Sequence, residues 1–228
     1  MARHSRLIVL NTMIETGLVP VFYHRDVEIS AHILQACLDG GARCVEYTNR
    51  GEQANRVFEE LARRFSDQDR LIFGVGSVVD AGTASLYIQS GAEFVVGPVL
   101  NPEVARVCNR RKVAYIPGCG SVSEISQAEE LGVEICKIFP GKEVGGPGFV
   151  EAVRGPMPWT RIMPTGGVDA TEESIRAWFK AGVACVGIGS KLITKERMAS
   201  QDYAGITEAT RQLLGWIESA RGGKPALA

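Results

Sequence analysis

The chain has 228 residues, with 25 basic and 26 acidic side chains, and its formal net charge is −1. Hydrophobic residues make up 45% of it and charged residues 22%, which is close to the average for soluble globular domains. These values exclude a wholly disordered chain, a collagen and a coiled coil. The balanced charge argues against a nucleic-acid-binding protein, and no apolar run reaches the roughly 18 residues of a membrane helix. We therefore expect neither nucleic acid nor a membrane as a partner.

The cysteines form no Cys-x-x-Cys pair, and most of them stand beside Val, Ile or Leu. This setting is typical of small buried apolar residues in a reducing compartment, so we expect a cytoplasmic protein without a disulfide or zinc framework. The apolar run at residues 7–10 is shorter than the roughly 7–15 residues of a signal-peptide core. The six cysteines are Cys37, Cys44, Cys108, Cys119, Cys136 and Cys185.

Eight short runs rich in β-branched residues follow one another along the chain. Each is continuously apolar rather than alternating, which is typical of strands that are covered on both faces, as in a parallel sheet. We expect strands at 19–24, 44–48, 71–75, 94–99, 113–117, 134–139, 160–164 and 184–189.

Amphipathic stretches separate these runs, and several end in a glycine followed by Ala or Val and the next strand. A glycine there predicts the left-handed conformation that ends a helix. Asp80, Asn101 and either Asp169 or Thr171 are suitable N-caps. We expect helices at 27–39, 51–66, 80–90, 101–111, 121–131, 147–155, 171–181 and about 203–220.

Eight strand–helix units in one chain favour an α/β fold of the (β/α)8 TIM-barrel type, formed as a single domain over residues 1–228. An extra N-terminal helix over 6–17 would plug the bottom of the barrel, and 221–228 would be a disordered tail. A doubly wound open sheet is the alternative, but no Gly-x-Gly-x-x-Gly motif follows the first strand.

Two charged residues interrupt the apolar runs: Lys137 in the sixth and Glu46 in the second. Burial favours the neutral amine of a lysine, which is a nucleophile suited to Schiff-base chemistry. Burial also raises the pKa of a carboxyl group, which can then transfer protons near neutral pH. The alternative is that the two residues form one structural ion pair, or that the lysine head reaches the surface.

Polar and glycine-rich segments follow several strands, at the end of a barrel where active sites lie. Arg50 comes just after the second strand, and its guanidinium could hold a substrate carboxylate through two parallel hydrogen bonds. The loops 164–167 and 187–190 follow the seventh and eighth strands, where barrels often bind phosphate, although glycines can also simply make turns. Of the three histidines only His24 stands at a strand end, so no metal cluster can be assembled.

Four segments, taken together, resemble the 2-keto-3-deoxy-6-phosphogluconate (KDPG) aldolases, a family that includes the bifunctional 4-hydroxy-2-oxoglutarate (KHG) aldolases. The resemblance runs in order from about residue 18 to 194, and the Glu-x-Thr-x-Arg and Lys-x-Phe-Pro motifs are its most specific parts. The segments are 45–50, 116–124, 137–140 and 164–168.

The resemblance implies a trimeric class I aldolase that needs no metal or other cofactor and acts on a small 2-keto acid, with pyruvate as a product. It makes Lys137 the Schiff-base lysine and Glu46 the general acid/base. By the same resemblance, substrate binding falls to Arg50, Ser77, Pro98 and Thr165, and phosphate binding to Gly166, Gly167, Gly189 and Ser190.

The chain departs from the family pattern at four positions near the expected substrate, one of which is Val99, where a glycine is frequent before Leu100. Ser77 stands where a threonine is usual, Gly97 replaces the common serine before Pro98, and Gly141 replaces the usual alanine after Lys-x-Phe-Pro. These departures leave the choice of 2-keto acid open, but not the lysine chemistry.

Three other hypotheses stay open from the sequence. A metal-free barrel isomerase or synthase acting on a phosphorylated small molecule would have the same phosphate loops but would form no covalent adduct. An aldolase of the family without a phosphate preference would cleave 4-hydroxy-2-oxoglutarate or a related acid. A non-enzymatic ligand-binding barrel would tolerate the loss of Lys137.

Overall fold

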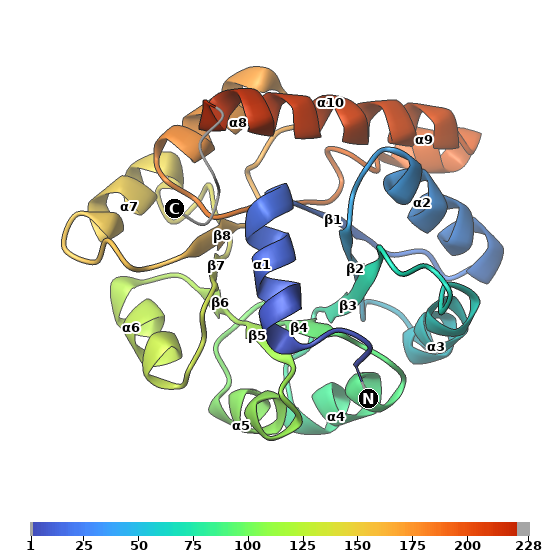
Figure 1. Cartoon of the computed structure of the whole chain (residues 1–228), viewed down its shortest axis with the longest axis horizontal. Coiled ribbons are helices and arrows are strands. Elements are labelled where there is room, and N and C mark those ends of the chain that lie inside the picture. Colours follow the sequence, from blue (N-terminus) through green and yellow to red (C-terminus); the bar gives the residue numbers. More distant parts are fainter. Residues whose placement is uncertain (1, 223–228) are drawn as a thin grey trace.

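The computed structural model describes residues 2–222, in which strands and helices alternate as the sequence predicts (Figure 1). Every strand residue is buried, as expected for strands covered on both faces. The strands are β1 (Leu18–Phe22), β2 (Cys44–Thr48), β3 (Ile72–Gly76), β4 (Phe94–Val96), β5 (Ala114–Ile116), β6 (Gly118–Cys119), β7 (Cys136–Ile138), β8 (Ile162–Pro164) and β9 (Val186–Ile188).

The helices surround the strands in Figure 1, except for α1, which lies across the middle. The short helix α9 has no counterpart in the sequence prediction, because its six residues bury no side chain and so leave no apolar periodicity. The helices are α1 (Arg6–Thr16), α2 (Val27–Asp39), α3 (Ala54–Arg64), α4 (Ala81–Gln89), α5 (Pro102–Arg111), α6 (Val122–Glu130), α7 (Gly146–Arg154), α8 (Glu172–Lys180), α9 (Lys195–Ser200) and α10 (Tyr203–Arg221).

The strands are parallel and form two sheets. One sheet has the order β5-β4-β3-β2-β1-β9, and the other has the order β6-β7-β8. The fifth predicted strand, 113–117, corresponds to β5, which ends before Pro117, a residue with no backbone N–H to donate to a neighbouring strand. The two-residue strand β6 begins just after Pro117, beyond the predicted range. At the other side, a bridge between Thr165 and Gly187 connects the end of β8 to β9. The predicted α/β class with a parallel, curled sheet is thus confirmed.

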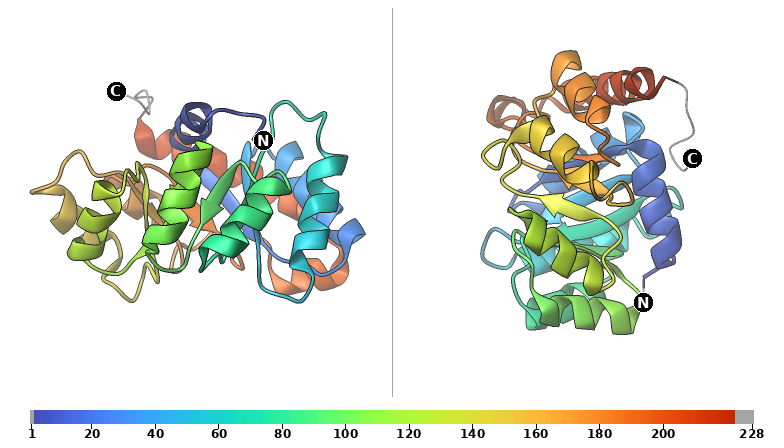
Figure 2. Two further views of the ribbon diagram at one scale, coloured as in Figure 1. Left: turned by 90° about the horizontal axis from the view of Figure 1, so that it is seen from below. Right: turned by 90° about the vertical axis from the view of Figure 1, so that its left-hand side faces the viewer.

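Alternate side chains of each strand face two different cores. One core lies between the strands and the surrounding helices, and includes Val45 and Tyr47 of β2. The other lies under α1 and joins Val9 and Met13 of that helix to Cys44 at the start of β2. The left view of Figure 2 places α1 at one end of the strands. The predicted N-terminal helix therefore covers the N-terminal ends of the strands and leaves their carboxyl ends for the site.

Local signals account for most helix ends. Asp80 accepts a hydrogen bond from Thr83 N at the start of α4, and Thr171, rather than Asp169, caps α8 by accepting from Ser174 N. The glycines that follow α4 and α8, Gly91 and Gly182, have φ values of 104° and 92°, which side-chain-bearing residues rarely adopt.

The prediction of a disordered tail over 221–228 is wrong at its first residue. Arg221 is the last residue of α10, and its guanidinium donates to the carbonyl oxygens of Ile14, Glu15 and Ala184, so it ties α10 to the end of α1. Residues 223–228 lie outside the described part of the chain. Within that part, no helix is both long and apolar enough to span a bilayer.

Candidate active site

Glycines on β3 make room for a carboxyl group inside the ring of strands. Glu46 is paired in register with Gly74, and a Cβ placed on Gly76 would lie 1.6 Å from Glu46 Oε1. A side chain at residue 76 would therefore occupy the space that the carboxylate fills. Glu46 is 2% exposed, and its Oε2 has no hydrogen-bond partner among the described residues. A buried acceptor without a partner is costly, which is typical of a functional site.

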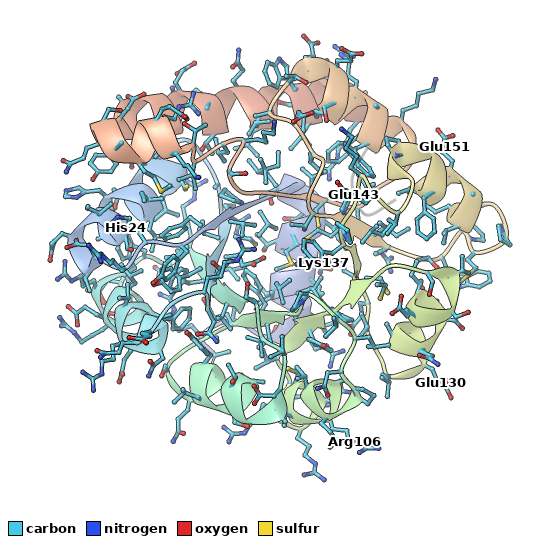
Figure 3. All side chains as sticks on the ribbon, turned by 180° about the vertical axis from the view of Figure 1, so that it is seen from behind. His24, Arg106, Glu130, Lys137, Glu143 and Glu151 are labelled. Carbon is cyan, nitrogen blue, oxygen red and sulfur yellow. The ribbon has the colours of Figure 1, made fainter. Side chains whose placement is uncertain are left out.

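Lys137 stands at the middle of β7, between Cys136 and Ile138, which both face the outer core. Its own side chain therefore faces inward, and it is 5% exposed. Figure 3, seen from the end opposite α1, shows Lys137 near the centre of the ring of strands. Its Nζ lies 4.6 Å from the ring centroid of Phe139.

Burial sets the protonation of both groups. Desolvation lowers the pKa of Lys137, the nearby carboxylate of Glu46 partly offsets this, and Arg50 lowers it further. Desolvation raises the pKa of Glu46, against the opposing effects of Lys137 and Arg50. Among residues 2–222, no ion pair within 4.0 Å joins Lys137 to Glu46. The two groups are thus close enough to affect each other's charge without the direct contact of a structural salt bridge.

Arg50 is held in place by Ser77. The guanidinium donates from Nε to Ser77 Oγ over 3.2 Å. Ser77 follows β3 with φ of 61°, in the left-handed region that non-glycine residues adopt at a cost. Such conformations gather at ligand-binding sites, where the surrounding structure holds them. The result is an arginine at the mouth of the ring, whose remaining N–H groups make no hydrogen bond to residues 2–222 and can meet an incoming anion.

A cavity of about 410 Å³ opens above these residues, at the carboxyl ends of the strands. Thr165 contributes a buried hydroxyl that has no hydrogen-bond partner among the described residues. It lies against Gly187, where a Cβ would be 2.5 Å from Thr165 Oγ1. Of the predicted site residues, the cavity wall includes Arg50, Thr165, Gly166, Gly167, Gly189 and Ser190.

The remaining predicted residues lie below or beside this cavity. Lys137 and Glu46 are not part of its wall, but Phe139, whose ring the Lys137 amine contacts, is. Pro98 lies beside β6: a Cβ on Gly118 of that strand would be 2.1 Å from Pro98 O. Gly118 is in turn paired in register with Lys137 of β7. The loop that carries Pro98 therefore packs against the strand next to the lysine.

Sequence reasoning missed several residues of the wall. Thr48 is 2% exposed, and its hydroxyl lacks a hydrogen-bond partner among the described residues. Its place two positions after Glu46 on β2, on the same face of the strand, was a usable signal. The other missed wall residues with polar or aromatic side chains are Phe22, Tyr23, Phe139, Lys191 and Lys195.

Two of the departures from the family pattern have a packing reason. A Cβ on Gly97 would lie 2.8 Å from Val99 O, and one on Gly141 would lie 2.6 Å from Gly166 O. The close approach at Gly141 comes from its N–H, which donates to Thr165 O over 3.0 Å. Glycine at residue 141 thus lets the loop after β7 pack tightly on the loop after β8.

Comparisons with known proteins point to one family. A model of the KDPG and KHG aldolases matches residues 9–209. The 2-dehydro-3-deoxy-phosphogluconate aldolase of Pseudoalteromonas atlantica is 31% identical over 194 residues, which cover 85% of this chain and 88% of that protein. The KHG/KDPG aldolase of Escherichia coli K12 is 28% identical over 202 residues, which cover 88% and 92%.

A solved structure resembles the chain along almost its whole length. The KDPG aldolase of Legionella pneumophila superimposes with a TM-score of 0.82 at 26% identity, covering 90% of this chain and 97% of that one. That enzyme was captured with pyruvate as a covalent carbinolamine intermediate. A carbinolamine is the adduct that an amine forms with a ketone before water is lost.

Proposed function

The chain belongs to the KDPG and KHG aldolase family, and from this membership we propose that it is a class I aldolase, an aldehyde-lyase that releases pyruvate from a 2-keto acid. The observation that carries the proposal is the inward-facing Lys137, buried on β7 with a lowered pKa and without an ion pair to Glu46 among the described residues. A neutral buried amine next to a cavity is a nucleophile for a ketone.

The first half of the reaction forms the covalent adduct. The lone pair of Lys137 Nζ attacks the C2 carbonyl of the substrate, and the carbonyl oxygen takes up a proton to give a carbinolamine. Loss of water then gives an iminium. Arg50, oriented by Ser77, holds the carboxylate next to C2 and so fixes the ketone over the amine. The hydroxyls of Thr48 and Thr165, which have no hydrogen-bond partner among the described residues, can donate to the oxygens of the substrate.

The second half breaks the C3–C4 bond. Glu46 accepts the proton of the C4 hydroxyl, directly or through a water. The C3–C4 electron pair moves toward the iminium nitrogen to form an enamine, and the aldehyde leaves. Glu46 returns its proton to C3, and water releases pyruvate and the neutral lysine. The raised pKa of Glu46 suits a group that must both accept and return a proton.

The substrate that this cavity fits best is 2-keto-3-deoxy-6-phosphogluconate. Gly166, Gly167, Gly189 and Ser190 line the cavity beyond Arg50, in the two loops where barrels bind phosphate. A metal-free isomerase or synthase would use the same loops, but it would not need a buried amine. A ligand-binding protein would need neither the amine nor the unpartnered carboxylate.

Further properties of the family are proposed here for this chain. The pairing of β1 with both β2 and β9, and the bridge from Thr165 to Gly187, support closure of the strands into one eight-stranded barrel and a single domain. The exposed Val79 and Val99, in the loops after β3 and β4, support an interface in a homotrimer. Six free and buried thiols support a cytoplasmic location.

Release of pyruvate tests the proposal. The purified protein is incubated with 2-keto-3-deoxy-6-phosphogluconate in the presence of EDTA, and pyruvate is measured with a coupled dehydrogenase. We expect cleavage by the wild type and none above background by Lys137→Met. Cleavage that persists in Lys137→Met, or that EDTA abolishes, would contradict a class I aldolase that uses Lys137.

A further inference from the structure

All three charged side chains that the described residues contribute to the wall of the cavity are basic. They are Arg50, which follows β2, and Lys191 and Lys195, which follow β9. Arg50 is already engaged by Ser77 and lies where the carboxylate of the 2-keto acid would bind. The two lysines belong to the segment that continues from the glycine loop at 187–190. The proposed cleavage does not use them, so their presence in the wall calls for a separate explanation.

Lys191 forms an ion pair with the loop that follows β8. Its Nζ lies 3.1 Å from Asp169 Oδ1, and Asp169 comes two residues after Gly167 in the loop that follows β8. The side chains are 63% and 51% exposed, so the ion pair contributes little to stability. An ammonium group has three N–H donors, and one bond to Asp169 leaves two for a ligand. The pair therefore places a cation between the two glycine loops.

The distance from C2 of the substrate to its second anionic group decides whether that group can reach the ammonium of Lys191. Lys137 acts at C2, deep below the cavity, whereas Lys191 is at the exposed rim. In 4-hydroxy-2-oxoglutarate the second carboxylate is bonded directly to C4, next to the bond that breaks. In the phosphorylated six-carbon acid, two further carbons and an oxygen separate C4 from phosphorus. Only the longer substrate extends its anionic end toward the rim.

We propose that Lys191, positioned by Asp169 and assisted by Lys195, is the specificity-determining side chain that selects a 2-keto acid with a distal phosphate over a shorter dicarboxylic acid. This inference rests on the proposed aldolase function and concerns the charged side chains, not the glycine loops. The ammonium groups supply charge-assisted hydrogen bonds to phosphate oxygens. These bonds add to those from the backbone N–H groups of the loops.

The test compares three substrates on matched variants. They are 2-keto-3-deoxy-6-phosphogluconate, its unphosphorylated analogue 2-keto-3-deoxygluconate, and 4-hydroxy-2-oxoglutarate. Lys191→Met removes the charge and keeps most of the volume, and Lys191→Arg keeps the charge. The control is Lys180→Met: Lys180 is an exposed lysine at the C-terminal end of α8, and the chain then runs into β9 from the end of the strands opposite the site.

We expect Lys191→Met to lower kcat/KM for the phosphorylated acid roughly 10- to 100-fold, mainly through KM, because a hydrogen bond to a charged group is lost. For the two unphosphorylated acids kcat/KM should change by less than about threefold, as for an ordinary surface substitution. Lys191→Arg should restore most of the loss, and Lys180→Met should match the wild type on all three substrates.

Equal losses on all three substrates, or no loss on the phosphorylated one, would overturn the assignment of Lys191. The aldolase proposal is judged separately, by borohydride trapping of pyruvate on Lys137 in the same preparations. If pyruvate is trapped on Lys137 but Lys191→Met affects the phosphorylated and unphosphorylated substrates alike, only the inference about Lys191 is contradicted. An absence of trapping in an active wild type would contradict the Schiff-base mechanism itself.

Discussion

The carboxylate of Glu46 occupies the space in which a side chain of Gly76 would stand: a Cβ at residue 76 would lie 1.6 Å from Glu46 Oε1 and 2.4 Å from its carboxyl carbon. The two residues belong to neighbouring strands, β2 and β3, and Gly76 is paired with Thr48 in the register. The position of the general acid/base thus depends on the absence of a side chain one strand away.

We expect Gly76→Ala to displace the Glu46 carboxylate and to lower kcat by about 10²-fold, since a misplacement of about 1 Å can cost that much. Steady-state cleavage of the phosphorylated acid measures the loss. Gly215→Ala is the matched control, because nothing lies within 4 Å of a Cβ at that helical position. A Gly76→Ala protein that is folded and fully active would show that the carboxylate can move without consequence.

The substitution Glu46→Gln removes proton transfer with little change in shape. General acid/base groups contribute typically ~10²–10⁴-fold, so we expect a loss of kcat of that order. Formation of the pyruvate imine at Lys137 should persist, because attack by the amine does not need the carboxylate. A stable Glu46→Gln variant that cleaves at the wild-type rate would restore the structural ion pair as the explanation for Glu46.

The dependence of cleavage on pH follows from two shifted groups. The reaction needs neutral Lys137, whose pKa burial lowers from 10.5, and ionised Glu46, whose pKa burial raises from 4.5. kcat/KM should therefore rise with pH, beginning above the ordinary range of a glutamate and levelling off below that of a lysine. Glu46 raises the pKa of Lys137, so in Glu46→Gln the rise in pyruvate imine formation should move to lower pH. A shift to higher pH would contradict this coupling.

The strained backbone of Ser77 offers a test of the carboxylate site. Ser77→Gly relieves the left-handed conformation at φ of 61° and removes the hydroxyl that orients Arg50. We expect a gain in unfolding free energy of roughly 1 kcal/mol and a rise in KM of about 10-fold. The control is Lys112→Gly, which relieves a similar φ of 55° at the C-terminal end of α5 and should change stability alone. An unchanged KM in Ser77→Gly would separate Ser77 from substrate binding.

Stability should improve when both buried charges are removed. The cost of burying Lys137 grows as pH falls from 10.5 to its lowered pKa, and the cost of burying Glu46 grows as pH rises from 4.5 to its raised pKa, so both groups destabilise the fold near neutral pH. We expect the inactive double variant Lys137→Met, Glu46→Leu to gain about 1–4 kcal/mol in unfolding free energy at pH 7. Urea denaturation measures it, and a large loss would mean that the pair stabilises the fold.

Local patterns account for what the sequence predicts well. Helix α2 lies at the predicted residues 27–39. Its bounds are readable from the sequence because an aspartate suited to the N-cap precedes an apolar face that ends in two glycines. Lys137 and Glu46 were identifiable because each is a single charge within an apolar strand. These signals need no knowledge of which strands are neighbours.

The remaining features depend on contacts between distant segments. The role of Gly76 follows from the register of β3 against β2, and the ion pair of Lys191 with Asp169 follows from the adjacency of two loops. The left-handed conformation of Ser77 has no marker, since serine rarely adopts it. The role of Gly141 likewise appears only where the loops after β7 and β8 meet.

Covalent trapping on Lys137 tests the central claim most directly. The protein is incubated with pyruvate and sodium borohydride, digested, and mapped by mass spectrometry, with Lys137→Met as the control. We predict one reduced pyruvyl group per chain, located on the peptide that contains Lys137, and none in the variant. A label on another lysine, or no label on a wild type that cleaves its substrate, would contradict the account.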